Sequence, residues 1–192
     1  MPTVGSDKTI VIDADIFSEM VKGTIFAVAQ NEGAKPILTG IYVTIEDRIL
    51  RFVAIDGYRL AIRRHNIDIE GSFSFILSGR AVGEAVKLID EETENVEISF
   101  GDRLVSFNIS GYSFISRLLE GEFVNYQKTI PAEHRQRVVV NTRELTNTIE
   151  RVSLLISESF STPIRCYFNE LNVVFTCATS VGRATETFNT KL

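Results

Sequence analysis

The sequence predicts an α+β fold built from a repeated β-α-β-β-β unit. Three stretches open alike: a short apolar extended run leads through a helix-capping residue into an amphipathic helix, and alternating segments follow. These openings lie at residues 9–13, 73–77 and 137–141, so the period is about a third of the chain. Because a single unit leaves an apolar face uncovered, we expect the repeats to pack as paired helices covered by antiparallel sheets.

The composition is that of a globular protein. The chain has 192 residues, 44% of them hydrophobic, which is enough for one or two domains with real cores. No stretch reaches the roughly 20 apolar residues that span a bilayer, and residues 1–8 do not resemble a signal peptide. We therefore expect a cytoplasmic protein with no membrane partner.

Net charge and cysteine content argue against several classes of function. A net charge of −5 argues against a surface coated with nucleic-acid-binding charge, although it allows a basic face on an acidic body. Cys166 and Cys177 lack C-x-x-C spacing and a nearby histidine. We expect two buried free thiols, with no metal, no cofactor and no disulfide.

The first repeat has clear boundary signals. Asp13 is expected to cap a helix that runs to about residue 30, where Gly33 and Pro36 break the pattern. Strands are expected over 37–45, 48–55 and 58–68. The Asp56-Gly57 pair predicts a tight hairpin in which both residues take positive φ. The apolar stripe of the helix consists of Phe17, Met20, Val21, Thr24 and Val28.

The second and third repeats follow the same plan. Ser78 caps the second helix, and strands are expected near 96–100, 103–109 and 112–118. Asn141 caps the third helix with Glu144 at the capping-box position, and strands are expected near 164–169, 171–178 and 183–190, with a hairpin at 169–170. The helix stripes are Val82, Ala85, Val86 and Ile89 in the second repeat, and Leu145, Ile149, Val152 and Ile156 in the third.

A polar, glycine-containing stretch at 120–131 separates the second repeat from the third and is typical of a domain linker. The expected domains are therefore 1–128, with two repeats, and 129–192, with one. The third repeat then has an uncovered helix face and sheet edge. We expect two chains to pair their third repeats about a twofold axis, because exposed edges attract partners.

Three ordered motifs point to a family: KPILTG at 35–40, FVAIDGYRLA at 52–61, and SRLLEGEFVNY at 116–126 followed by Ile130-Pro131. With them the chain resembles the bacterial replicative sliding clamp, the beta subunit of DNA polymerase III, over its central domain and the first half of its third domain. The resemblance implies the DNA-clamp fold, six such units per subunit, and a homodimeric ring around duplex DNA. Tyr58 stands where these clamps often carry histidine, and Val124 where they often carry proline.

The resemblance also implies a partner-peptide site. Clamps of this family bind polymerase, clamp loader and repair proteins through short peptides that end in bulky apolar residues. An apolar floor beside an aromatic ring and an arginine suits such peptides, although Leu38, Ile55 and Leu60 could equally be ordinary strand core. The matching positions are Leu38, Ile55, Gly57, Tyr58, Arg59, Leu60, Val124 and Thr129.

Duplex DNA is the second expected ligand, because helices line the hole of such a ring. Contacts of basic side chains with phosphates carry no sequence information and weaken with salt. The same residues could instead be solvated helix positions balanced by neighbouring acids. The candidates for facing DNA are Lys22, Arg80, Lys87, Arg143 and Arg151.

Little in the sequence indicates catalysis. His65 and His134 lie far apart, without the spacing of a metalloprotease, a serine hydrolase or a phosphate-binding loop. The acidic run at 90–94 lacks the glycine-spaced loop of a calcium site. We interpret the chain as a non-catalytic processivity factor. The alternatives are a truncated clamp-like module that binds partner peptides without encircling DNA, and a hydrolase that uses His65 or His134.

Overall fold

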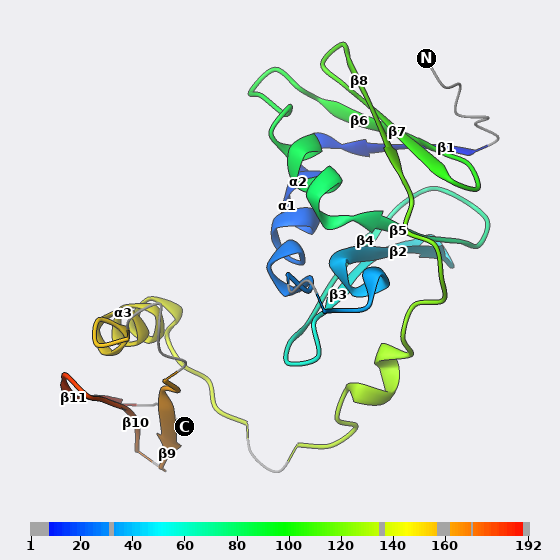
Figure 1. Cartoon of the computed structure of the whole chain (residues 1–192). Coiled ribbons are helices and arrows are strands. Elements are labelled where there is room, and N and C mark those ends of the chain that lie inside the picture. The colour runs from blue at the N-terminus through cyan, green and yellow to red at the C-terminus, as the bar shows by residue number, and fades with distance from the viewer. Residues whose placement is uncertain (1–7, 31–32, 135–136, 157–161, 170, 190–192) are drawn as a thin grey trace. The chain divides into compact units, whose positions relative to one another are not determined.

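A computed structural model describes residues 8–30, 33–134, 137–156, 162–169 and 171–189. Helices and antiparallel sheets confirm the α+β class. The chain divides into two compact units, Met1–Ile130 and Pro131–Leu192, here called unit 1 and unit 2 (Figure 1). The sequence placed this division between residues 128 and 129. Among the described residues, no helix is long and apolar enough to cross a membrane.

Unit 1 contains two complete repeats, each with one helix and four strands. The 3-10 turns η1 (Ile25–Ala27), η2 (Pro36–Thr39) and η3 (Tyr126–Thr129) lie outside these elements. The first repeat comprises β1 (Lys8–Asp13), α1 (Ala14–Lys22), β2 (Gly40–Glu46), β3 (Ile49–Ile55) and β4 (Leu60–Asn66). The second comprises β5 (Phe73–Ser78), α2 (Gly79–Val86), β6 (Asn95–Phe100), β7 (Leu104–Ile109) and β8 (Tyr112–Arg117).

The two repeats of unit 1 exchange their first strands. One sheet has the order β1-β6-β7-β8, so the first strand of repeat one pairs with repeat two. The other has the order β4-β3-β2-β5, so the first strand of repeat two pairs with repeat one. All these neighbours are antiparallel. The sequence predicted the pairing of repeats but not this reciprocal exchange.

A single core joins both sheets of unit 1 to both helices. Phe17 on α1 is completely buried, with its ring centroid 6.2 Å from that of Phe52 on β3 and 6.0 Å from that of Phe107 on β7. α1 packs against α2, and the two helices lie side by side in Figure 1. Burying one large aromatic ring between the two sheets ties the repeats into one domain.

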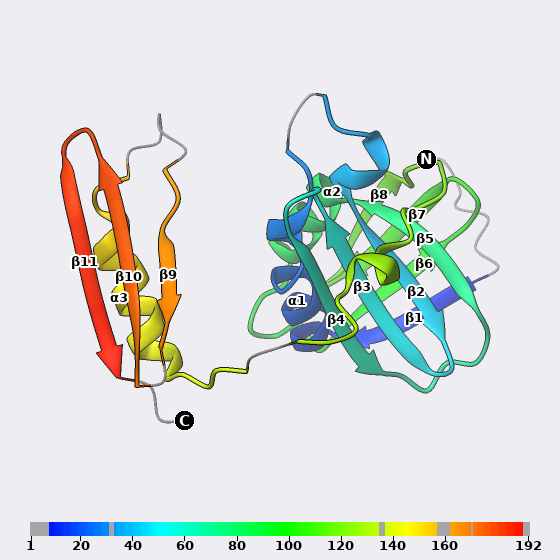
Figure 2. The same cartoon turned by 90° about the horizontal axis from the view of Figure 1, so that it is seen from below.

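Unit 2 contains one repeat. α3 (Thr142–Ser153) packs on a three-stranded antiparallel sheet of order β11-β10-β9, with α3 along one face in Figure 2. Its small core is centred on Val152, Val173, Phe175 and Cys177. The strands are β9 (Arg165–Phe168), β10 (Asn172–Thr179) and β11 (Gly182–Asn189).

The hairpin turns differ from their expected form. Asp47-Arg48 and Ser110-Gly111 are the two-residue turns with both φ values positive. The tight turn expected at Asp56-Gly57 is wrong. Ile55 pairs with Leu60, so four residues form that loop, and only its Gly57 has positive φ, at 93°. The expected hairpin at 169–170 includes residue 170, which lies outside the described residues.

Several boundaries and burial predictions are also corrected. The first helix ends at Lys22 rather than near residue 30, because Gly23 caps it and a separate 3-10 turn follows. Ser78 occupies the second N-cap without a side-chain hydrogen bond. Cys166 is exposed, not buried, because β9 is an edge strand. Ile149 is 39% exposed, and Thr148 is buried in its place.

Candidate functional site

The eight expected partner-peptide positions all belong to unit 1 and come from three short segments. Leu38 lies in η2, and Val124 precedes η3, which ends at Thr129. The other five lie at or beside the loop between β3 and β4. These five are Ile55, Gly57, Tyr58, Arg59 and Leu60.

Asp56 organises the β3–β4 loop. One of its carboxylate oxygens, Oδ1, accepts hydrogen bonds from the backbone amides of Tyr58 and Arg59, both at 2.9 Å. Its Oδ2 accepts a third hydrogen bond, from Arg59 Nε, also at 2.9 Å. These bonds stabilise the charged carboxylate and lower the pKa of Asp56 to about 2. The loop is therefore held in one conformation by its own first residue.

This conformation leaves two of the expected site residues, Tyr58 and Arg59, exposed to solvent. Tyr58 is 96% exposed, so its ring is available to a ligand. The guanidinium of Arg59 is fixed through Nε, and its side chain remains 55% exposed. Its two terminal nitrogens can still donate to a peptide carbonyl or carboxylate. The sequence predicts Asp56 only as a turn former, because its role in positioning Arg59 depends on side-chain hydrogen bonds that no local pattern shows.

Ile55 and Leu60 face each other across the β3–β4 pair. Both are half-buried, whereas their neighbours Ala54 and Ala61 belong to the buried core. Leu38 is half-buried too. These three apolar side chains are thus only partly covered, which is the state expected of a floor that can accept an apolar ligand.

Val124 and Thr129 belong to the segment that follows β8 and ends with η3. Phe123 stacks on Tyr42 with ring centroids 4.7 Å apart, which holds this segment against the sheet. Val124 lines a hollow of about 460 Å³ over β2 and β3. That hollow includes neither Leu38, Ile55 nor Thr129. The structure thus joins the five loop positions but does not unite all eight in one pocket.

The expected DNA-facing residues are all exposed on the three α-helices or at their ends. Lys87 forms an ion pair with Glu84 at 2.9 Å, and Arg151 forms one with Glu186 at 3.0 Å. Each ion pair lowers the pKa of its carboxyl group, and the hydrogen bond contributes more to this shift than the attraction between the charges. Lys22, Arg80 and Arg143 form no ion pair within the described ranges.

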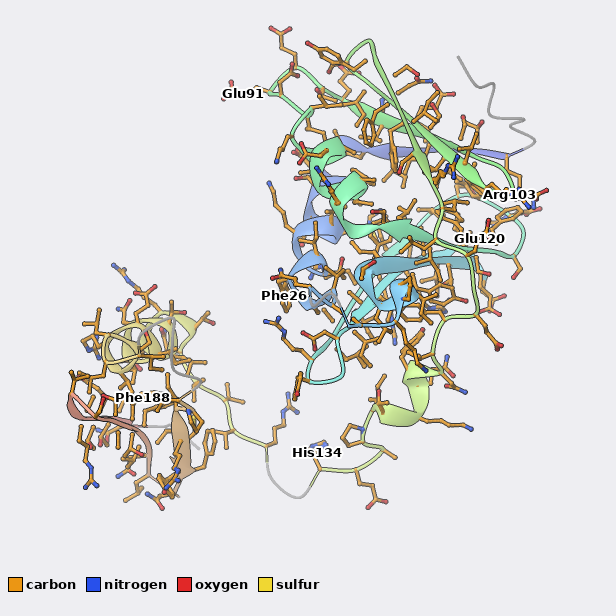
Figure 3. All side chains as sticks on the ribbon, viewed as in Figure 1. Phe26, Glu91, Arg103, Glu120, His134 and Phe188 are labelled. Atoms are coloured by element: carbon orange, nitrogen blue, oxygen red, sulfur yellow. The ribbon has the colours of Figure 1, made fainter. Side chains whose placement is uncertain are left out.

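The two histidines belong to different units. His65 lies on β4 opposite Leu50, and His134 lies in unit 2 outside any helix or strand, as Figure 3 shows. Neither histidine takes part in any side-chain hydrogen bond or ion pair found among the described residues. Among all the residues that the structure describes, no group of three or more His, Cys, Asp or Glu side chains is placed to hold a metal ion.

Comparison with known proteins gives a consistent picture. The family described as DNA polymerase III beta subunit, central domain, matches residues 11–125. The beta sliding clamp of Bacillus subtilis is 32% identical over 160 residues, which are 82% of this chain and 42% of the relative. That of Staphylococcus epidermidis is 29% identical over 191 residues, which are 98% of this chain and 50% of the relative.

Solved structures agree with the sequence relatives. The chain superposes on a DNA polymerase sliding clamp from Bacillus subtilis with a TM-score of 0.91 and 28% identity, covering all of this chain and 51% of that one. For a putative DNA polymerase III beta subunit from Eubacterium rectale the TM-score is 0.93 and the identity 26%, with 52% of that chain covered. The chain spans about half the length of these relatives.

Proposed function

The chain belongs to the DNA polymerase III beta subunit family, and we propose that it acts as a bacterial sliding clamp. In this role it tethers the replicative polymerase to duplex DNA and binds partner proteins through short peptides. The observation that carries the proposal is the family match over residues 11–125. The likeness of fold along the whole chain supports it. A replication factor of this kind would work in the bacterial cytoplasm, as a homodimer.

The peptide site is proposed at the β3–β4 loop and its surroundings. Ile55 and Leu60 supply a partly exposed apolar floor, Tyr58 supplies a free aromatic face, and Arg59 supplies oriented donors. A peptide with bulky apolar side chains could bury them on this floor while Arg59 binds its backbone. Polymerase, clamp loader and repair proteins would compete for the same residues.

DNA contact is proposed through Lys22, Arg80 and Arg143. Because these three form no ion pair within the described residues, they lose no protein partner when they bind a phosphate. Lys87 and Arg151 already neutralise carboxylates, so their contribution should be smaller. Binding of this type is weak, blind to sequence and sensitive to salt.

No chemistry of its own is proposed for the chain, which would act as a non-catalytic accessory protein. A second candidate function is a clamp-like module that binds partner peptides without encircling DNA. This alternative needs only the residues around the β3–β4 loop, which lie together in unit 1. The two candidate functions share the peptide site and differ in whether the protein encircles DNA.

Two assays test these proposals. A fluorescein-labelled peptide ending in Leu-Phe should bind the chain saturably, whereas the same peptide ending in Ala-Ala should not. If binding of the first peptide does not saturate, the proposed peptide site is wrong. Retention on nicked circular DNA that is lost on linearisation supports the encircling clamp. Equal and weak retention on both DNA forms leaves the peptide-binding module as the function.

A further inference from the structure

Two arginines lie directly opposite each other in the sheet β4-β3-β2-β5 of unit 1. Arg51 on β3 pairs with Arg64 on β4, and Thr44 on β2 pairs with Arg51 from the other side. Directly paired residues of antiparallel strands project from the same face, so the three side chains form a row across three strands. Like charges in such a row repel each other, and a negative group placed between them would relieve this repulsion.

This row lies on the outer face of the sheet, away from the helices. Val43 precedes Thr44 and Phe52 follows Arg51 along their strands, and both are buried in the core shared with α1 and α2. Because side chains alternate between the two faces of a strand, the row points the opposite way. The segment that carries η3 crosses this outer face in front of β3 in Figure 2. The row is therefore separate from the helix residues proposed to contact DNA.

The hollow of about 460 Å³ lies over this row and is here called the arginine hollow. Thr44, Arg51 and Arg64 line it, together with residues 122–127 of the segment that crosses the sheet. Its volume is in the range typical of sites that bind small molecules. Tyr126, which is only half-buried, contributes an aromatic ring. The arginine hollow thus combines two cationic groups with an aromatic surface.

The guanidinium groups of the arginine hollow have unused hydrogen-bond donors. The side chain of Arg51 is only 20% exposed, and its one ion-pair partner among the described residues is Glu46, at an N–O distance of 3.5 Å. Arg64 has no ion pair within the described ranges. Neither arginine donates a side-chain hydrogen bond to another described residue; the arginines that do are Arg48, Arg59 and Arg151. Because a largely covered charge without hydrogen bonds is costly, an acceptor in the hollow would stabilise Arg51.

We propose that the arginine hollow binds a small phosphorylated molecule with a flat ring, such as a nucleotide. Its terminal phosphate would lie between Arg51 and Arg64, and its ring against Tyr126. Guanidinium groups bind phosphate and carboxylate through paired N–H donors. A terminal phosphate presents three oxygens, so two arginines can bind it together, whereas one arginine already engages both oxygens of a carboxylate. The hollow is larger than a phosphate alone requires, which leaves room for a ring that stacks on tyrosine. The proposal is independent of peptide and DNA binding.

Two carboxylates compete with such a ligand. Glu46 and Glu122 are the other charged side chains that line the arginine hollow among the described residues. The side chain of Glu46 is 62% exposed, and Glu122 is exposed too, so both can turn toward solvent when a ligand enters. A bound phosphate would then replace the long contact between Glu46 and Arg51 with shorter hydrogen bonds. Removing Glu46 should therefore strengthen binding.

Titration of the full chain with ADP, followed by amide chemical shifts, is the first test. Saturable shifts are expected at Thr44, Arg51, Arg64 and residues 125–127. Because the net charge of the chain is −5, its overall charge does not attract anions, so saturation would report a specific site. Inorganic phosphate lacks the ring and should bind more weakly than ADP, and succinate more weakly than phosphate. A duplex oligonucleotide should not displace ADP. Absence of saturable shifts with ADP, a different order of the three affinities, or displacement of ADP by the duplex would overturn the proposal.

Substitutions test the residues. Arg64→Gln should weaken ADP binding at least about tenfold, and because Arg64 is exposed, the fold should be retained. Arg103→Gln is the matched control, since the side chain of Arg103 is 83% exposed and lies outside the arginine hollow. Glu46→Gln should strengthen ADP binding, which damage to the fold would not do. Equal ADP affinity of wild type and Arg64→Gln, equal loss in Arg64→Gln and Arg103→Gln, or weaker binding by Glu46→Gln would contradict the assignment.

Discussion

Asp56 and Arg59 are joined across the β3–β4 loop by a hydrogen bond of 2.9 Å from Arg59 Nε to Asp56 Oδ2. The carboxylate also accepts two backbone amides of the loop. One acidic residue thereby fixes both the loop and the direction of the guanidinium.

Asp56 should make the stability of the wild type depend on pH in a defined window, and replacing it should remove that dependence. Its folded-state pKa is lowered from 3.8 to about 2, so its stabilising effect is present above pH 4 and lost as the pH falls through about 2. The urea midpoint of wild type should exceed that of Asp56→Asn at pH 5, and the gap should narrow as the pH falls below 4 and close below pH 2. A gap of constant size across this range would contradict the assigned hydrogen bonds.

Tyr58 is expected to bind peptide without supporting the fold. Because Tyr58 is 96% exposed, Tyr58→Ala should leave the midpoint of urea unfolding unchanged. The same substitution should weaken binding of the Leu-Phe peptide by at least about 1 kcal/mol, or roughly fivefold. Tyr112→Ala is a matched control, since Tyr112 follows the equivalent Ser110-Gly111 turn and is 60% exposed. Equal loss of affinity in both variants would place the site elsewhere.

Phe17→Ala should destabilise unit 1 by about 3–5 kcal/mol, because it opens a cavity between Phe52 and Phe107. Phe26→Ala should change stability by less than about 0.5 kcal/mol, since Phe26 is 52% exposed and labelled in Figure 3. Urea unfolding followed by circular dichroism measures both. Comparable effects of the two variants would mean that Phe17 does not join the sheets.

The basic residues should contribute to DNA binding through phosphates. Alanine at Lys22, Arg80 or Arg143 should each lower the slope of log affinity against log salt by about 0.9. Arg103→Ala is the control, because Arg103 is highly exposed on the β6–β7 turn and lies 3.7 Å from Glu120 (Figure 3). Fluorescence anisotropy with a duplex at several salt concentrations measures the slopes. If none of the three substitutions changes the slope, these residues do not contact DNA phosphates.

Much of the local structure could be predicted because its causes are local. Asp13 caps α1 by accepting from the amides of Asp15 and Ile16, and Asn141 caps α3 in the same way. Alternation of apolar residues located the strands to within a few residues. The repeat was visible because each copy has the same order of cap, helix and strands.

The rest depends on contacts between distant segments. Alternation shows which face of β1 is buried but not which strand lies beside it, so the exchange between repeats was missed. The sequence predicts a buried thiol for Cys166, which stands in a strand-like run, yet the position of that strand at the sheet edge leaves it exposed. For the peptide site, the sequence supplied the residues through family resemblance, while the role of Asp56 required its three hydrogen bonds.

Amide chemical shifts of the full chain, recorded as the Leu-Phe peptide is added, show which residues the peptide contacts. If the chain binds partner peptides on unit 1 as proposed, saturable shifts should appear at Leu38, at residues 55–60 and around Val124. Shifts should be small at the equivalent second-repeat turn around Gly111. No saturable shifts, or shifts confined to unit 2, would contradict it.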